Sequence, residues 1–233
     1  MRKIATLLTA LVVVMLLLPM PAALARSAER FSYGERVDFA GAGWLAETDY
    51  STTNLEIRVF DLDYRSTDSG PVNSKDPGIV LFFRHREWDP VTGVMTETNY
   101  EGFSGSGAIF EFDRSLRRAE ATFPLRLYGY RCLYPEDGGP VGIAKAVECV
   151  EIGEPTVQAH IVWTGVGPIT RDAFNDRGSE PPWFIGQAHL VEAFRDAEAE
   201  GTVAGDGLVL ADGQAAYAVL LRGKYHDQLV LPR

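Results

Sequence analysis

The stretch AEATFPLRLY, residues 119–128, decides the fold class of this chain. From Ala119 to Leu127, every second side chain is apolar and the side chains between them are mostly polar. A period of two is typical of a β-strand with one buried face, because a helix repeats its faces every three to four residues. Pro124 would break a helix interior, and in a strand it indicates a sheet edge or a bulge. The stretch therefore predicts a half-buried strand.

The rest of the chain repeats this alternation between turn-forming residues. NLEIRVFDLDY (residues 54–64) alternates and then changes phase, which predicts a bulge near Phe60. DPVTG (residues 89–93) predicts a hairpin turn, and Arg222-Gly223 predicts the turn of a final hairpin. The spacing of strands and turns predicts an all-β fold of about 10 to 14 strands, arranged as an antiparallel β-sandwich or barrel.

The segment LRRAEAT (residues 116–122) has a near copy, FRDAEAE, at residues 194–200. At the same offset, the apolar faces of further predicted strands coincide over residues 79–125 and 157–203. Two long copies favour one duplication over a solenoid of many short repeats, although a chance match of common residues is the alternative. We expect two related repeats that share one core, in a single all-β domain over residues 26–233.

The N-terminus has the three parts of a secretory signal peptide. Basic residues at positions 2 and 3 precede an apolar run at positions 4–20, and Ala23 and Ala25 form a small-residue cleavage site. An uncleaved anchor helix is the alternative, but prolines end the apolar run early for a membrane span. We expect residues 1–25 to be removed and the chain to be secreted or periplasmic, with no later segment apolar enough to cross a membrane.

The chain is acidic, with 22 basic and 32 acidic residues and a formal net charge of −10. Such a charge repels phosphate backbones and anionic lipids. Nucleic acid is therefore excluded as a partner.

Two cysteines, Cys132 and Cys149, enclose a turn-rich segment. Export permits a disulfide, and a bridge across a loop of this length would stabilise the fold by about 3 kcal/mol on the chain-entropy model. The alternative is two buried thiols. A lone pair at this spacing does not form a metal motif. We predict a Cys132–Cys149 disulfide.

VWTGVGPITRD (residues 162–172), followed by FRDAEAEGTV (residues 194–203), resembles a motif pair of uncharacterised secreted bacterial all-β proteins, with WTGxGP as its signature. The resemblance covers the second repeat well and the first only loosely. It implies export and a β fold, and no activity is attached to it.

Two glycine-rich stretches do not meet the requirements of catalytic motifs. GFSGSG (residues 102–107) has Ser106 where the serine-hydrolase elbow needs glycine, and a strand follows it in place of a helix. GVGPIT (residues 165–170) ends in Thr170 where the dinucleotide fingerprint needs glycine. A turn and a strand end are the interpretations that fit these stretches.

Several residues that could bind a metal or a ligand are scattered through the chain. Zinc needs three or four clustered ligands, and among the histidines only His160 and His189 fall on neighbouring predicted strands. The aspartate-rich segment at residues 61–70 could suit calcium, but its spacing does not match an EF-hand loop. Exposed tryptophans can grip sugars or proteins, whereas buried ones fill cores. The residues considered are His85, His160, His189 and His226; Asp61, Asp63 and Asp68; and Trp44, Trp88, Trp163 and Trp183.

Two carboxylate pairs, Glu111/Asp113 and Glu198/Glu200, have the spacing of neighbours on one strand face. Such pairs could flank a glycosidic bond, although charge is ordinary on the polar face of a strand. We assign no catalytic, cofactor-binding or metal-binding residue. The favoured function is extracellular binding or assembly by a non-catalytic β protein with a protein or glycan partner. The alternatives are a secreted hydrolase that uses carboxylates and a small-ligand carrier.

Overall fold

The computed structural model describes residues 30–66, 70–73, 76–104, 107–134, 148–180 and 184–230. These residues form strands, turns and loops, without a helix. The predicted signal peptide lies outside the described residues, as do Asp68, Ser106 and Trp183. Within the described part of the chain, no helix is long and apolar enough to span a membrane.

The chain order of the strands is β1 (Arg30–Thr48), β2 (Ser51–Ser66), β3 (Gly70–Asn73), β4 (Gly78–Trp88), β5 (Met95–Ser104), β6 (Ile109–Phe112), β7 (Arg118–Arg126), β8 (Tyr128–Tyr134), β9 (Glu148–Gly153), β10 (Thr156–Gly165), β11 (Thr170–Glu180), β12 (Phe184–Gly205), β13 (Leu208–Gln214) and β14 (Tyr217–Val230).

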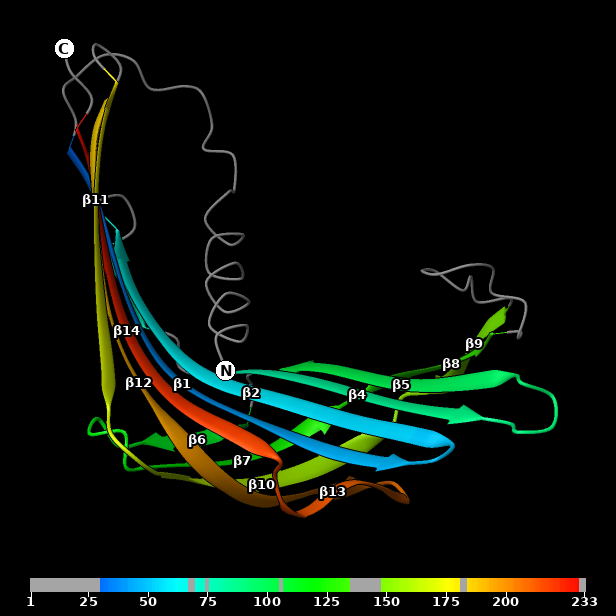
Figure 1. The fold of residues 1–233 in the computed structure, drawn as a ribbon. Coiled ribbons are helices and arrows are strands. Elements are labelled where there is room, and N and C mark those ends of the chain that lie inside the picture. The colour runs from blue at the N-terminus through cyan, green and yellow to red at the C-terminus, as the bar shows by residue number, and fades with distance from the viewer. Residues whose placement is uncertain are drawn as a thin grey trace.

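All strands belong to one antiparallel sheet, which curls into a half-barrel (Figure 1). The path of hydrogen-bonded neighbours runs β6-β7-β10-β12-β14-β1-β2-β4-β5-β8-β9, with β11 and β13 on β12 and β3 on β2. Long strands β1, β2, β12 and β14 run from a curled base into an upright arm (Figure 1). The prediction of an all-β antiparallel fold is confirmed.

The stretch at residues 119–128 behaves as its alternation predicts. Ala119, Ala121, Phe123 and Leu125 of β7 are buried, and the side chains between them are exposed or half-buried. The short β6 pairs only with residues 119–122, so at Pro124 the described part of β7 has a paired neighbour on the β10 side alone. The missing amide hydrogen of this proline therefore falls at a local sheet edge, as predicted.

The twin segments lie on opposite sides of β10. Trp163 stands directly opposite Ala119 of β7 and Ala199 of β12, and Val162 opposite Glu120 and Glu200. Each copy therefore places one alanine against the same buried tryptophan. Whether the copies arose by duplication stays a prediction.

The change of phase in β2 is not a bulge, so that prediction is wrong. The pairing of β2 with β1 runs without a register shift from Ser51 to Ser66. Instead, the sheet changes the face that is apolar. Leu55, Ile57 and Val59 fill the interior of the base, whereas Leu62 and Tyr64 lie on the opposite face of the arm.

The other long strands change phase at the same level of the sheet, where the base meets the arm. In β1 the buried apolar side chains are Ala40, Ala42 and Trp44, but towards the arm Val37 and Phe39 occupy the other face. We call the face that carries Ala40 and Val59 the core face and its reverse the outer face. The arm comprises β11 and residues 30–39, 60–66, 184–194 and 221–230.

The two turn predictions have opposite outcomes. The Asp89–Gly93 turn joins β4 to β5, with Gly93 N donating to Asp89 O at 2.8 Å and Gly93 at a φ of 68°. Arg222-Gly223 is not a turn, because β14 passes through both residues and places Gly223 between Val37 of β1 and Glu192 of β12. The predicted final hairpin is therefore wrong.

A disulfide joins Cys132 of β8 to Cys149 of β9, as predicted from the sequence. The two cysteines stand directly opposite each other in the β8–β9 pairing. The bridge fastens β9, which is the last strand on that side of the sheet path, to the rest of the sheet.

Candidate binding surfaces on the arm

Charged side chains replace apolar ones on the core face of the arm. Residues that stand directly opposite in register share a face, so Arg222, Asp38 and Asp61 form one row across β14, β1 and β2. Lys224, Arg36 and Asp63 form the next row, further along the arm. The hydrophobic interior of the base thus gives way to an ionic surface on the same face of the sheet.

Asp38 is the buried centre of this surface, with only 4% of its area exposed. Arg36 donates to its carboxylate at 2.7 Å, and Arg222 Nε lies 3.3 Å from Asp38 Oδ1 as an ion pair. Arg36 also approaches Asp63 at 3.8 Å. Asp38 therefore pairs with two arginines that β1 and β14 bring to it.

Asp61 lies beside the same acids, and no described residue forms an ion pair with it. Burial raises the pKa of its carboxyl, and repulsion by Asp63 and Asp38 raises it further, whereas Arg36 offsets only part of this. The acids of the surface thus gather on β1 and β2, away from β11.

On the β11 side, four basic residues surround a depression of about 410 Å³. Arg114 comes from the β6–β7 turn, Arg171 from β11, and Arg222 and Lys224 from β14. Residues 191–193 of β12 complete the lining. We call this depression the basic pocket.

Arg222 also fixes the position of the β6–β7 turn at the pocket. Its Nη1 donates to the main-chain oxygen of Arg114 at 3.3 Å, while its Nε pairs with Asp38. No ion pair to Arg114, Arg171 or Lys224 is present among the described residues. Three of the four cations of the pocket are therefore free of a counter-charge within the described chain.

Glu192 is one of the residues that line the pocket, yet its carboxyl belongs to the other face. It stands opposite Asp172, whereas its neighbour Ala193 stands opposite Arg171 and Arg222 on the core face. Burial raises the pKa of Glu192, and Asp172 adds repulsion. Neither effect comes from the pocket cations, so this acid does not neutralise them.

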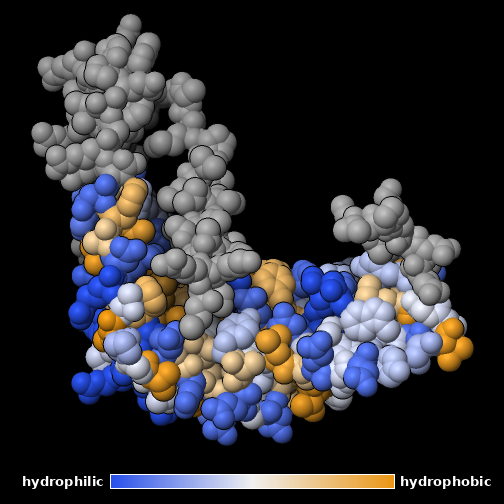
Figure 2. Space-filling model, viewed as in Figure 1, coloured by the Kyte–Doolittle hydropathy of each residue, from blue (hydrophilic) through white to orange (hydrophobic). Residues whose placement is uncertain are grey.

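The outer face of the arm is predominantly apolar. Its side chains come from β11, β12, β14, β1 and β2, and Phe174 is 59% exposed. Hydrophobic residues are visible on the arm in Figure 2, among hydrophilic ones. The members of this surface, the outer apolar face, are Tyr33, Val37, Phe39, Phe60, Leu62, Tyr64, Phe174, Leu190, Phe194, Leu221 and Tyr225.

Three tyrosines gather at one end of the outer apolar face. The ring of Tyr33 lies 6.3 Å from that of Tyr64 and 6.1 Å from that of Tyr225. The Tyr33 hydroxyl donates to Glu35 at 2.9 Å. Burial, together with the nearby Asp227, raises the pKa of Tyr225 to about 12. The phenols of Tyr33 and Tyr225 stay protonated and satisfy carboxylates that would otherwise interrupt an apolar surface.

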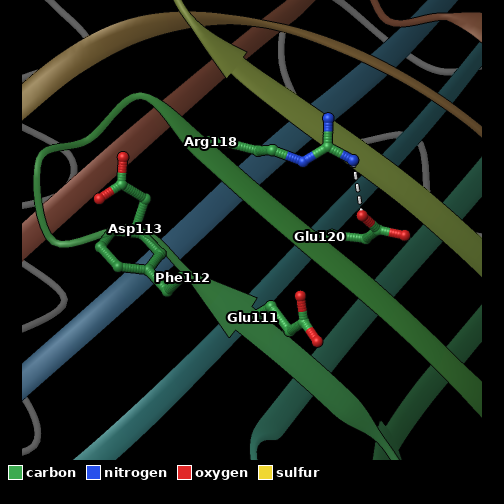
Figure 3. A pocket seen from close by; sticks show the side chains of 5 residues that line it. All are labelled: Glu111, Phe112, Asp113, Arg118 and Glu120. Atoms are coloured by element: carbon green, nitrogen blue, oxygen red, sulfur yellow. Dashed lines mark hydrogen bonds and ion pairs between the residues drawn. The ribbon is translucent and has the colours of Figure 1, made fainter.

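The predicted carboxylate pairs are not acid pairs of the glycosidase type. Asp113 lies in the turn after β6, where it accepts bonds from Ser115, and Figure 3 shows it apart from Glu111. Glu111 instead faces Glu120 across the β6–β7 pairing, in a shallow depression of about 240 Å³. Glu198 and Glu200 are exposed on the polar face of β12.

Glu120 is already engaged by two side chains, Arg118 and His160. Arg118 donates to it at 2.6 Å, and His160 Nε2 lies 3.0 Å from its other oxygen. The hydrogen bond with His160, together with Arg118, lowers the pKa of the Glu120 carboxyl. A general acid needs the opposite shift, so this depression has the chemistry of a surface ion-pair cluster.

The structure separates His160 from His189, which the sequence placed on neighbouring strands. His160 faces Glu120 on the outer side of the base, whereas His189 stands directly opposite His226 on the core face of the arm. His85 accepts or donates a bond with Thr53 at 2.8 Å. Among the described residues, no group of three or more His, Cys, Asp or Glu side chains could hold a metal ion.

The tryptophans of the described chain are structural. Trp163 is fully buried, and Trp44 is nearly so and donates to Gly213 O at 3.1 Å. Trp88 is half-buried at the end of β4. The two calcium candidates that the structure describes, Asp61 and Asp63, belong to the ionic surface of the arm with Arg36 and Asp38.

The WTGVGP motif forms the passage from β10 to β11. Gly167 has a φ of 70°, and its carbonyl oxygen accepts a bond from Arg195 Nε at 3.0 Å. Arg195 Nη1 also reaches Leu116 O at 3.4 Å. The motif thus connects the base to the arm, and Arg195 ties it to the turn of the first twin segment.

Comparison with known proteins assigns no function to these surfaces. No protein-family model matches the chain, and no curated protein matches it in sequence. The basic pocket and the outer apolar face therefore rest on geometry alone. Neither surface was predicted from the sequence, although one signal was present. The change of phase in β2 also occurs in β1, β12 and β14. It places polar residues of the arm on the face that is apolar in the base.

Proposed function

We propose that this chain is an exported, non-catalytic β protein that acts by assembly, and that a second copy of the chain covers the outer apolar face. The observation that carries the proposal is the size and continuity of that face across five strands. Soluble monomers rarely expose contiguous apolar patches larger than a few hundred Å². Export is supported by the signal-peptide pattern at residues 1–25 and by the Cys132–Cys149 disulfide, which oxidising compartments favour.

The dimensions of the face suit self-association. Five strands about 4.8 Å apart and four rows of outward side chains about 6.7 Å apart give about 650 Å² on each copy. Two such faces bury about 1,300 Å², within the range of specific protein interfaces. Phe174, Phe194 and the three tyrosines are the residue types that interfaces favour. A symmetric pair of copies is also the commonest form of oligomer.

One pair of acids makes this association pH-dependent. Asp172 and Glu192 lie opposite each other on the same side of the arm, and the pKa of Glu192 is already raised by burial and by Asp172. A second copy would bury Glu192 further. Protonation removes this repulsion, so the dimer should tighten as the pH falls from about 8 to about 5.

Analytical ultracentrifugation of the exported chain between about 1 and 100 μM tests the proposal. We expect a monomer–dimer equilibrium that Phe174→Ser weakens about tenfold or more. Ile109→Ser is the matched control, because Ile109 is 64% exposed on β6, outside the outer apolar face. A chain that stays monomeric throughout this range at both pH values overturns the assembly, and equal weakening by the two variants overturns the assigned surface.

A further inference from the structure

We infer that the basic pocket is a binding site for a small organic molecule that carries a tetrahedral oxyanion, such as a phosphoryl or sulfate group. The site lies on the core face of the arm, opposite the outer apolar face, and its four basic residues take no part in the proposed assembly. If the pocket does not bind an anion, the proposed assembly still stands. If the chain does not self-associate, the proposed binding site still stands.

The pocket is basic, although the chain as a whole is acidic. Four basic residues surround one depression in a chain whose formal net charge is −10. Arg222 shares its charge with Asp38, whereas Arg114, Arg171 and Lys224 have no ion-pair partner among the described residues. Clustered like charges repel one another, and an anion in the depression would relieve that repulsion.

The donor groups of the pocket suit the oxygens of a tetrahedral oxyanion. Arginine presents a planar fork of N–H groups that matches the oxygens of phosphate or sulfate, and lysine adds a compact charge. Arg171 enters from β11 and Lys224 from β14, on either side of residues 191–193. Cations that converge from two strands and a turn can contact several oxygens of one group, as a tetrahedral oxyanion requires.

One wall of the pocket is preorganised by contacts within the chain. Arg222 is held by Asp38 at 3.3 Å, and Asp38 is held in turn by Arg36 at 2.7 Å. The same Arg222 bonds the main chain at Arg114 and so fixes the turn that carries this side chain. A wall that is positioned before the ligand arrives reduces the ordering cost of binding.

The volume and lining of the basic pocket favour an organic anion over a bare inorganic ion. A depression of about 410 Å³ exceeds the needs of one inorganic ion and lies within the range of small-molecule sites. Val191 and Ala193 contribute apolar surface beside the cations. The ligand therefore combines an oxyanion with a small carbon skeleton.

Isothermal titration calorimetry of the exported chain with glucose 6-phosphate, and separately with inorganic phosphate and glucose, tests this inference at constant ionic strength. We expect glucose 6-phosphate to bind, inorganic phosphate to bind more weakly, and glucose not to bind. Arg171→Gln and Lys224→Gln should each weaken binding about tenfold, since each removes a hydrogen bond to a charged group. Arg131→Gln, an exposed arginine on β8, is the matched control and should leave binding unchanged.

Three results would overturn the inference. One is the absence of binding by either phosphate up to about 10 mM. Another is an affinity that the double variant Arg171→Gln/Lys224→Gln leaves unchanged while its melting curve shows that it is folded. The third is an equal loss in Arg131→Gln, which would indicate non-specific attraction. Equal affinities for the two phosphates would retain the oxyanion site and exclude the organic skeleton.

Discussion

Trp163 Nε1 donates a hydrogen bond to the carbonyl oxygen of Gly41 at 3.0 Å, between residues 122 positions apart. The two residues belong to β10 and β1, which are not neighbours in the sheet, since β12 and β14 lie between them. The bond therefore crosses the interior of the curled base. It fixes the curl itself, because a flat sheet would hold these strands far apart.

Replacing Trp163 should destabilise the chain more than any exposed substitution. Trp163→Ala removes a fully buried ring and should lower the free energy of unfolding by about 3 to 5 kcal/mol. Trp163→Phe keeps an aromatic ring but loses the bond to Gly41, so its loss should be smaller. Urea unfolding measures both, and Ile109→Ala should stay within about 0.5 kcal/mol of the native chain. Equal losses in Trp163→Ala and Ile109→Ala would contradict the role of this bond and its packing.

Gly201 permits the close approach of β12 to β10 in the base. A Cβ at this position would lie 2.8 Å from Ile161 Cα and would also meet the main-chain oxygen of His160. Main chain cannot move aside as a flexible side chain can. Gly201→Ala should therefore lower the free energy of unfolding by about 1 to 3 kcal/mol, as overpacking does in other cores.

Gly34→Ala is the control for this prediction, and thermal unfolding of both variants is the measurement. Gly34 also lies within a long strand, but a Cβ there meets no atom closer than 3.7 Å. Alanine restricts the unfolded chain more than glycine does, so Gly34→Ala should be neutral or stabilising. If the melting temperature of Gly201→Ala equals or exceeds that of Gly34→Ala, β10 and β12 can move apart without a loss of stability.

Sequence reasoning succeeded where the signal was local. The alternation over residues 119–128 needed only one strand to be read, and the Asp89–Gly93 turn needed only five residues. It failed where several strands act together. In a single strand, a change of phase looks like a bulge. Only the comparison of four neighbouring strands shows that the apolar side chains move from one face of the sheet to the other.

The same limit applies to the candidate surfaces. Gly223 follows Arg222 as in a tight turn, yet β1 and β12 pair with both residues and hold them in a strand. The basic pocket joins Arg114, Arg171 and Lys224, which are far apart in the sequence and form no motif. Only the topology, which places β11, β12 and β14 together beside the β6–β7 turn, assembles them.

Asp61 should destabilise the native chain at neutral pH. Burial, Asp63 and Asp38 raise its folded pKa above the ordinary 3.8, so the ionised carboxyl is disfavoured by folding. Below the ordinary value both states are protonated, and the penalty is absent. As the pH rises through the ordinary value and then the raised one, the penalty develops fully. Asp61→Asn should therefore gain stability at neutral pH and lose that advantage in acid.

Chemical unfolding of Asp61→Asn from about pH 3 to about pH 8 measures this gain. Glu198→Gln, on the exposed polar face of β12, is the control for removal of one acid. An advantage of Asp61→Asn that persists unchanged in acid would show that its origin is packing and not charge.

Glu97 should show the opposite pH dependence. Burial alone would raise its pKa, but hydrogen bonds from Asn99 and Arg86, with the charges of Arg86 and Arg84, outweigh burial and lower it. Arg86 Nε donates at 2.6 Å and Asn99 Nδ2 at 2.9 Å. Because folding lowers the pKa of Glu97, the ionised carboxylate stabilises the native state at pH values above its ordinary pKa of 4.5. This stabilisation is lost as the pH falls through the pKa of the folded state.

Glu97→Gln should therefore cost about 1 to 3 kcal/mol at neutral pH, because Arg86 loses its charged acceptor, and the cost should fade in acid. The register places Cys132 directly opposite Glu97, with Cys149 beyond it, so the disulfide strands border this carboxylate. Release of β9 by Cys132→Ala/Cys149→Ala should admit water to Glu97 and weaken its ion pair. The cost of Glu97→Gln, measured by urea unfolding, should then shrink in the cysteine-free chain. A cost that is the same with and without the disulfide would mean that β4 and β5 alone set the environment of Glu97.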